Sequence, residues 1–174
     1  MYHGLHHTID VLDQAERIAI EEGVIDADDI LILKVACLYH DIGFLVAYNG
    51  HEEEGCVMAK EELPGFDFSD QQIETICRII MATKIPQTPL SHMEKIICDA
   101  DLDYLGRPDF FLISRSLFWE MKARDYIKDE KEWDLLQTRF IASHSYFTLA
   151  NQNLREKQKQ EHLKMLEAKV EARA

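Results

Sequence analysis

The chain has 174 residues, of which 47% are hydrophobic and 29% are charged, so it is long enough to bury a core and has ordinary globular composition. Its formal net charge of -13 argues against nucleic-acid binding and against attraction to anionic membranes, because both need a basic surface. A small phosphorylated substrate stays compatible with this charge, since a bound divalent cation can dominate the local field.

Four cysteines lie far apart in apolar surroundings, without a Cys-x-x-Cys pair: Cys37, Cys56, Cys77 and Cys98. This spacing predicts reduced core residues, as expected of a cytoplasmic protein. The chain opens with polar and histidine-rich residues, which is unlike a signal peptide, and its longest apolar run is too short to span a bilayer. We therefore expect a cytoplasmic protein that does not associate with membranes.

Apolar residues recur at helical spacing along the chain, and no stretch has the alternation typical of a strand. Helices are expected over about residues 4–22, 27–41, 50–62, 70–83, 92–105 and 108–128, with a long last helix from about residue 133. Several starts are predicted from caps: Asn49, the capping boxes Ser69–Gln72 and Ser91–Glu94, and Pro108 in a first turn. About seven helices with short connections predict an all-α helical bundle.

The expected domain covers residues 1–150, and a polar helical extension follows over residues 151–174. The extension is predicted either to be solvated or to contact a partner through Leu163, Leu166 and Val170. A homodimer is the assembly that we expect such a contact to form.

The segment Ile30–Leu38 is apolar at every position except Lys34, and Tyr39, His40 and Asp41 follow it. A helix that is apolar on nearly all sides is a buried helix. Ionisable residues at its end need a partner or a metal ion, because a buried isolated charge is unfavourable. The pair is therefore either half of a metal site or a satisfied core histidine beside a capping aspartate.

A third acidic position stands out at Asp101, which a helical projection places in an apolar arc between Ile97 and Leu105, whereas Asp99 falls on the opposite face. A carboxylate there needs a cation, so Asp101 is either a metal ligand or the partner of a buried arginine, such as Arg78 or Arg107. His3 and His7, four residues apart, share one helix face and are either metal ligands or a surface pair.

Three motifs, taken in chain order, resemble those of the HD-domain superfamily of metal-dependent phosphohydrolases: Tyr2-His3-x-x-x-His7-Thr8-x-Asp10-Val11, His40-Asp41 and Ala100-Asp101-x-x-Tyr104-Leu105-Gly106. The resemblance covers roughly residues 2–120 and implies an all-α HD domain. It also implies a metal site formed by four ligands: His7, His40, Asp41 and Asp101. His3 matches a histidine that, in one branch of the superfamily, protonates the leaving oxygen.

Two imidazoles and two carboxylates suit one divalent transition metal ion, namely Mn, Fe, Co, Ni or Zn. Such an ion lowers the pKa of water and polarises phosphorus, and Asp41 is expected to accept the proton of the nucleophile. Binuclear relatives carry two further histidines; His51 fits the first position, but Thr83 occupies the second. We therefore expect one firmly bound ion, with a second site weak or absent, and His51 is either an outer group of the site or a helix-start residue.

Lys84 and Arg107 lie at the ends of presumed site helices and are expected to contact a substrate anion, the alternative being ordinary surface charge. The resulting hypothesis is a metal-dependent phosphohydrolase that acts on a small phosphoester, with a nucleotide as one candidate. The alternative is a non-catalytic signalling module that binds a metal ion and a nucleotide. A dinuclear iron oxygenase needs more ligands than the sequence offers.

Overall fold

The computed structural model describes residues 2–173, and in this range the only regular elements are helices, with no strand. The first helices and short 3-10 helices are α1 (Leu5–Glu21), α2 (Ala27–Tyr39), η1 (Ile42–Leu45), α3 (His51–Glu62) and η2 (Leu63–Phe66). The later ones are α4 (Asp70–Ala82), α5 (His92–Asp101), η3 (Asp103–Gly106), α6 (Phe110–Ala123), α7 (Glu130–Ser143) and α8 (Leu149–Glu171). The predicted all-α fold is confirmed.

The chain divides into two compact units. The first unit is Leu5–Asp101, which runs from α1 to α5, and the second unit combines residues 2–4 with residues 102–173. The predicted domain over residues 1–150 stays a prediction. Every residue expected to ligate metal falls inside the first unit.

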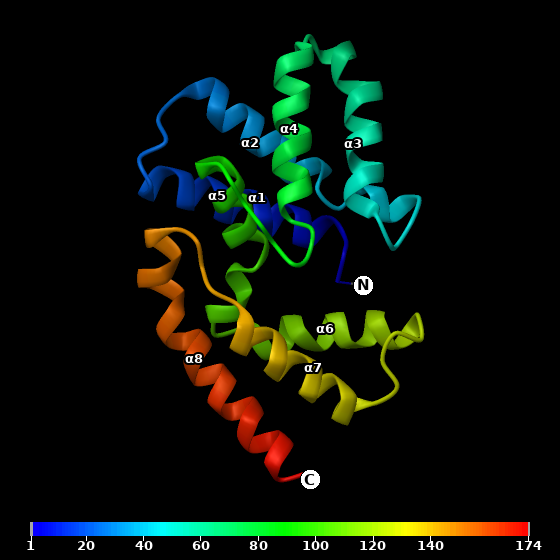
Figure 1. Ribbon diagram of the computed structural model, residues 1–174, viewed down its shortest axis with the longest axis vertical. Helices are drawn as coiled ribbons and strands as arrows, with labels where there is room; N and C mark the ends of the chain where they lie inside the picture. The colour runs from blue at the N-terminus through cyan, green and yellow to red at the C-terminus, as the bar shows by residue number, and fades with distance from the viewer. Residues whose placement is uncertain (1, 174) are drawn as a thin grey trace. The chain divides into compact units, whose positions relative to one another are not determined.

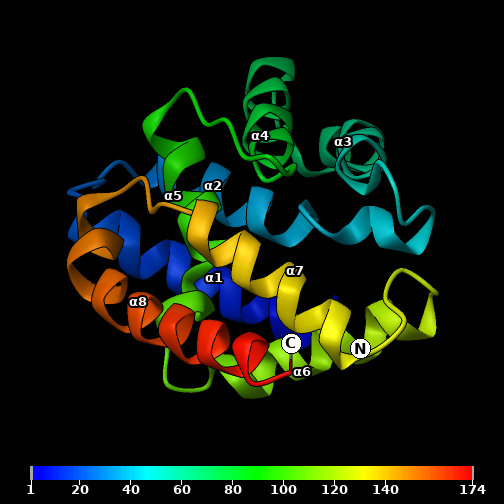
Figure 2. The same cartoon turned by 60° about the horizontal axis from the view of Figure 1, so that its bottom comes forward.

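The first unit is built on α1, which packs against α2 and α5, while α4 packs against α2, α3 and α5 (Figure 1). Isoleucines at helical spacing supply much of its core, and the fully buried ones on α4 and α5 are Ile76, Ile79, Ile80, Ile96 and Ile97. In Figures 1 and 2, α3 and α4 lie side by side as a helical hairpin. This packing fixes the ends of the helices on which the candidate site is built.

The helix starts at the two predicted capping boxes are confirmed, whereas two other predicted starts differ in detail. The capping box of Ser69 and Gln72 is present, and Ser91 and Glu94 exchange hydrogen bonds of 3.2 and 3.3 Å. The cap of α3 is Gly50 rather than Asn49, with a φ of 78° that glycine adopts without strain. Pro108 precedes the cap of α6 instead of standing in its first turn.

The predicted long last helix is two helices, so the described residues contain eight α-helices rather than seven. α7 ends at Ser143, and α8 begins after Thr148, whose hydroxyl accepts a hydrogen bond from the amide of Asn151. The intervening residues 144–148 are rich in aromatic and hydroxyl side chains, which are weaker helix formers than the flanking residues. Apolar residues keep their helical spacing across the break, so periodicity alone predicts one continuous helix.

In the second unit α8 packs against α7 and η3 (Figure 2). Leu166 is 1% exposed and shares a hydrophobic cluster with Tyr104, Phe110 and Ile141, and Leu163 packs against the same cluster. The expectation that these leucines are solvated or reserved for a partner is therefore wrong, because their own chain covers them. The predicted homodimer stays a prediction.

A buried polar cluster joins α8 to the end of α7. The ammonium of Lys159, which is fully buried, donates to the carbonyl oxygen of His144 at 2.7 Å and lies 2.9 Å from the Glu156 carboxylate and 4.9 Å from the centre of the Tyr146 ring. Burial, helped by the neighbouring positive charge of Lys159, lowers the pKa of His144 to about 4. The imidazole is therefore neutral in the folded protein at pH 6.

Acidification is expected to destabilise the protein through His144. In the unfolded chain this histidine takes up a proton below its ordinary pKa of 6.5, whereas the folded chain resists protonation until about pH 4. No loss arises above pH 6.5, and roughly 2–3 kcal/mol of the free energy of unfolding is lost between pH 6.5 and 4. Urea titrations across this range should show a shallower pH dependence for His144→Gln than for the wild type. Equal dependences would contradict the prediction.

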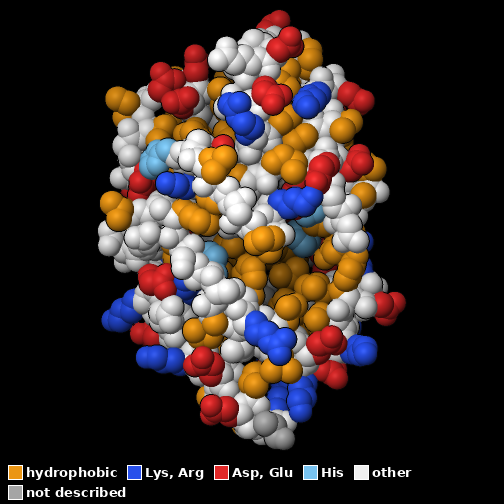
Figure 3. All heavy atoms as spheres, in the orientation of Figure 1, with side chains coloured by type: hydrophobic (Ala, Val, Ile, Leu, Met, Phe, Trp, Pro, Cys, Tyr) orange, Lys and Arg blue, Asp and Glu red, His pale blue; other side chains and the backbone are white. Residues whose placement is uncertain are grey.

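Acidic and basic side chains are interspersed with hydrophobic ones over the face shown in Figure 3. All four cysteines are buried with free thiols, as predicted.

Within residues 2–173, none of the helices has both the length and the hydrophobicity required to cross a bilayer.

Candidate metal centre

Four predicted ligands lie at the ends of three helices of the first unit. His7 stands in the first turn of α1, His40 is the C-cap of α2 with Asp41 directly after it, and Asp101 is the last residue of α5. The histidines are 5% and 1% exposed, and the side chains of Asp41 and Asp101 are 12% and 16% exposed. Two buried imidazoles thus meet two carboxylates that remain partly open to solvent.

The side-chain atoms converge within coordination range of one point. Ligand atoms of His7, His40 and Asp101 all lie within 4.8 Å of one another. The Nε2 atom of His7 lies 3.1 Å from Oδ1 of Asp101 and 3.4 Å from Oδ2 of Asp41, and the Nε2 atom of His40 lies 3.3 Å from the same Asp41 oxygen. An ion bound by nitrogen and oxygen at about 2.0–2.2 Å requires spacings of this order.

The ring of His40 is oriented as a ligand would be. Its Nδ1 atom lies 2.8 Å from the carbonyl oxygen of Cys37, to which it donates, so Nε2 is the ring nitrogen directed toward the carboxylates. When the ring is neutral, this atom carries the lone pair that a metal ion needs. That Nε2 atom is buried and makes no hydrogen bond. A buried polar atom without a hydrogen bond is rare in proteins. The residues present therefore fit a divalent transition metal ion.

The electrostatic field at the site favours a cation. Burial alone would lower the pKa of His40, but Asp41 and then Asp101 outweigh burial and raise the pKa to about 9. A positive charge is thus stabilised at this position, and a divalent ion would satisfy the same field.

His51 and Glu52 extend the polar wall beyond Asp41. The Nε2 atom of His51 lies 3.7 Å from Oδ1 of Asp41 and 3.4 Å from the carboxylate of Glu52, which is 6% exposed. The ring of Phe44 stacks on His51 with the ring centres 3.7 Å apart. His51 is therefore both the first residue of α3 and a neighbour of the centre, so the two alternatives for it are combined. Thr83 directs its hydroxyl to the carbonyl of Ile80 at 2.8 Å.

His3 belongs to the second unit, where Glu120 of α6 holds it. Its Nδ1 atom lies 2.5 Å from Oε1 of Glu120, and the backbone amides of Tyr2 and His3 donate to Oε2 at 2.6 and 3.1 Å. Burial would raise the pKa of Glu120, but the bonds from His3 lower it. Glu120 therefore fixes the position of the His3 ring and of the backbone beside it. The role of His3 as a proton donor stays a prediction.

The two cations expected to contact substrate both pair with carboxylates. Lys84 hydrogen-bonds Glu53 at the surface, and this pairing lowers the pKa of Glu53. Arg107, in the second unit, lies 2.7 Å from Asp109 and 3.8 Å from Asp103. Their contact with a substrate anion stays a prediction.

Sequence reasoning missed several buried acids, among them Asp99, Asp103 and Glu120. Asp99, expected on the face opposite the apolar arc, is fully buried, and so is Asp103, which accepts hydrogen bonds from Arg155 and Asn151 at 2.9 and 3.1 Å. The helical projection does not apply to Asp103, because α5 ends at Asp101 and a 3-10 helix follows. Asp99 lies inside α5, which packs against α1, α2 and α4, so the face opposite the apolar arc is covered as well. For Glu120, its place between aromatic and apolar neighbours was an available signal.

Comparisons with known proteins address the family and the fold of the chain. The sequence profile of the HD domain matches residues 4–103, which is more than half of the chain and closely follows the first unit. The fold is similar to the crystal structure of a predicted HD superfamily hydrolase from an uncultured Thermotogales bacterium, with a TM-score of 0.61 and 21% identity over 99% of this chain and 82% of that one. The search of curated proteins gave no match. A profile match of this extent, with His40 and Asp41 at the centre of the converging side chains, places the chain in the HD domain family.

Proposed function

We propose that the protein is a metal-dependent phosphohydrolase that acts on a small phosphoester, with nucleotides as the first class to test. The observation that carries the proposal is the convergence of two buried imidazoles and two carboxylates around the Nε2 atom of His40, which has no hydrogen bond. The name of the similar Thermotogales protein, a predicted hydrolase, also supports it.

His7, His40, Asp41 and Asp101 would hold the ion. A bound divalent ion would supply Lewis-acid chemistry, because it lowers the pKa of water and polarises a phosphoryl oxygen. Asp41 can accept a proton, since one of its oxygens faces the histidines and the other faces His51. The Cys37 carbonyl keeps the ring of His40 in the tautomer that ligation requires.

Lys84 would contact the substrate anion from the surface of the first unit. Its ammonium is paired with Glu53, so a phosphate that bound there would have to replace that carboxylate. His3, oriented by Glu120, would assist departure of the leaving group, as the resemblance implies. Arg107 is the other candidate for an anion contact.

The test is a screen of phosphoesters with protein loaded separately with Mn, Fe, Co, Ni or Zn. Protein purified without a chelator should contain about one transition metal ion per chain by elemental analysis, and it should release phosphate or a nucleotide product from at least one compound. A chelator should abolish the release, and the returned metal should restore it.

The same screen separates the proposal from a non-catalytic module. Nucleotide binding by calorimetry at every metal load, without product, would support a signalling module built on the same site. Absence of bound metal in protein that is otherwise folded would contradict both functions. Two irons per chain would support the dinuclear oxygenase instead.

A further inference from the structure

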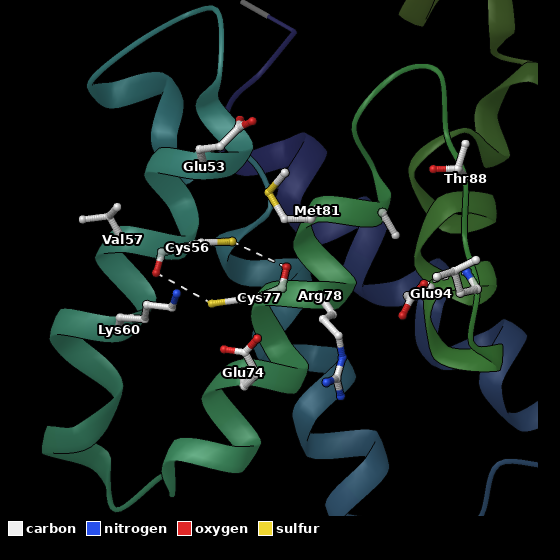
Figure 4. A pocket seen from close by; sticks show the side chains of 12 residues that line it. Glu53, Cys56, Val57, Lys60, Glu74, Cys77, Arg78, Met81, Thr88 and Glu94 are labelled. Atoms are coloured by element: carbon white, nitrogen blue, oxygen red, sulfur yellow. Dashed lines mark hydrogen bonds between the residues drawn. The ribbon is translucent and has the colours of Figure 1, made fainter.

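A groove of about 500 Å³ runs between α3, α4 and the segment before α5. Apart from Glu53, the partner of Lys84, its lining residues have no part in the proposed chemistry. Its lining combines sulfur atoms and charges, and the side chains that matter here are Cys56, Lys60, Cys77, Arg78 and Met81. Figure 4 shows the two thiols directed toward the facing helix and the thioether of Met81 between the same two helices.

The two thiols are held face to face. The Sγ atom of Cys56 donates to the carbonyl oxygen of Cys77 at 3.5 Å, and the Sγ atom of Cys77 donates to the carbonyl oxygen of Cys56 at 3.7 Å. The residues are 8% and 6% exposed, so they are buried yet still line the groove. Met81 follows Cys77 by four residues on α4 and therefore stands on the same helix face.

We propose that Cys56 and Cys77, assisted by Met81, form a site for a soft monovalent metal ion of the copper(I) or silver(I) kind. Thiolate and thioether ligands select such ions, whereas imidazoles and carboxylates of the kind gathered at His40 suit harder divalent ions. The protein thus offers two separate sites of different chemical character within its first unit.

The charge of the site changes when an ion binds. Burial raises the pKa of the Cys56 thiol to about 12, with Cys77 adding to the effect, so the ion has to displace a proton that this thiol holds firmly. Two thiolates and one monovalent ion leave a net charge of -1, which the ammonium of Lys60 on the groove wall can offset. The other charged groups that line the groove are Glu53, Glu74, Arg78 and Glu94.

Binding is an exchange of protons for the ion, without a redox step. Each S–H bond breaks, each sulfur keeps its electron pair and forms a bond to the ion, and two protons are released to solvent. One copper(I) ion plus two thiols therefore gives one bis-thiolate complex plus two protons, and the charges balance.

The experiment is an anaerobic titration of the reduced, full-length protein with copper(I), in competition with a chromogenic copper(I) chelator. One ion per chain should bind with release of two protons, and its X-ray absorption spectrum should show sulfur ligands. Cys56→Ser and Cys77→Ser should each weaken binding by about 100-fold or more, beyond the effect usual for an outer partner of a ligand. Met81→Leu should weaken binding about tenfold, or 1.4 kcal/mol.

Cys98→Ser is the matched control, because Cys98 is buried on α5 and bonds the carbonyl of Ala82 but does not line the groove. It should bind copper(I) as the wild type does. The proposal is overturned if the wild type binds no copper(I), if the spectrum shows only nitrogen and oxygen ligands, or if both thiol variants retain the affinity. The spectrum needs no variant, so it decides the matter even if a substitution prevents folding.

Discussion

Replacement of His7 by glutamine is expected to lower the affinity for the transition metal ion by about 100-fold or more. The Nε2 atom of His7 lies 3.1 Å from Asp101 and 3.4 Å from Asp41, so its loss removes the nitrogen ligand that links both carboxylates. Turnover of the best phosphoester should fall by at least the same factor at limiting metal. Calorimetric titration with Mn and steady-state rates at several metal concentrations provide the measurement.

His6 supplies a matched control, because it directly precedes His7 on α1 but is exposed to solvent. His6→Gln should keep the metal affinity and the rate of the wild type. If the two variants lose metal equally, the effect comes from α1 and not from ligation. If His7→Gln keeps full metal affinity, the assignment of the centre is wrong.

The His40–Asp41 pair was predictable because its context is local. Nine residues that are apolar except at one position come shortly before two ionisable residues. Because a buried charge is unfavourable unless it is paired, these two residues need a partner or a cation. The sequence alone left two alternatives, a metal ligand and a satisfied core histidine. The structure favours the metal site, because the Nε2 atom of His40 is buried without a hydrogen bond beside Asp41 and Asp101.

The partners of His3 and His51 were not predictable in the same way. Glu120 is 117 residues away from His3 along the chain, and no local pattern relates the two positions. The contact of His51 with Asp41 depends on how η1 turns the chain between α2 and α3. Periodicity also fails at the break between α7 and α8, because a capped turn can preserve the apolar spacing on both sides.

Among the glycines of the first unit, Gly43 is the one whose replacement by alanine is expected to lower the free energy of unfolding most. Gly43 lies in η1, two residues after Asp41, and a Cβ atom there would overlap the backbone carbonyl of His51 and lie 2.9 Å from the Cβ atom of Glu54. Backbone cannot move aside as a flexible side chain can, so η1 and α3 must separate. We expect a loss of about 3 kcal/mol or more, which lowers the Tm by roughly 6–12 °C.

Gly65→Ala is the control for this prediction, since no atom lies within 4 Å of the Cβ that it would add and its φ is not in the left-handed region. Its Tm should stay unchanged or rise slightly, because alanine restricts the unfolded chain. The same η1–α3 contact that excludes a methyl group also holds His51 beside Asp41. Gly43→Ala should therefore weaken metal binding about tenfold even at temperatures where the protein stays folded, as disturbance of an outer shell does. Retention of wild-type affinity and Tm by this variant would show that the turn after Asp41 does not position the centre.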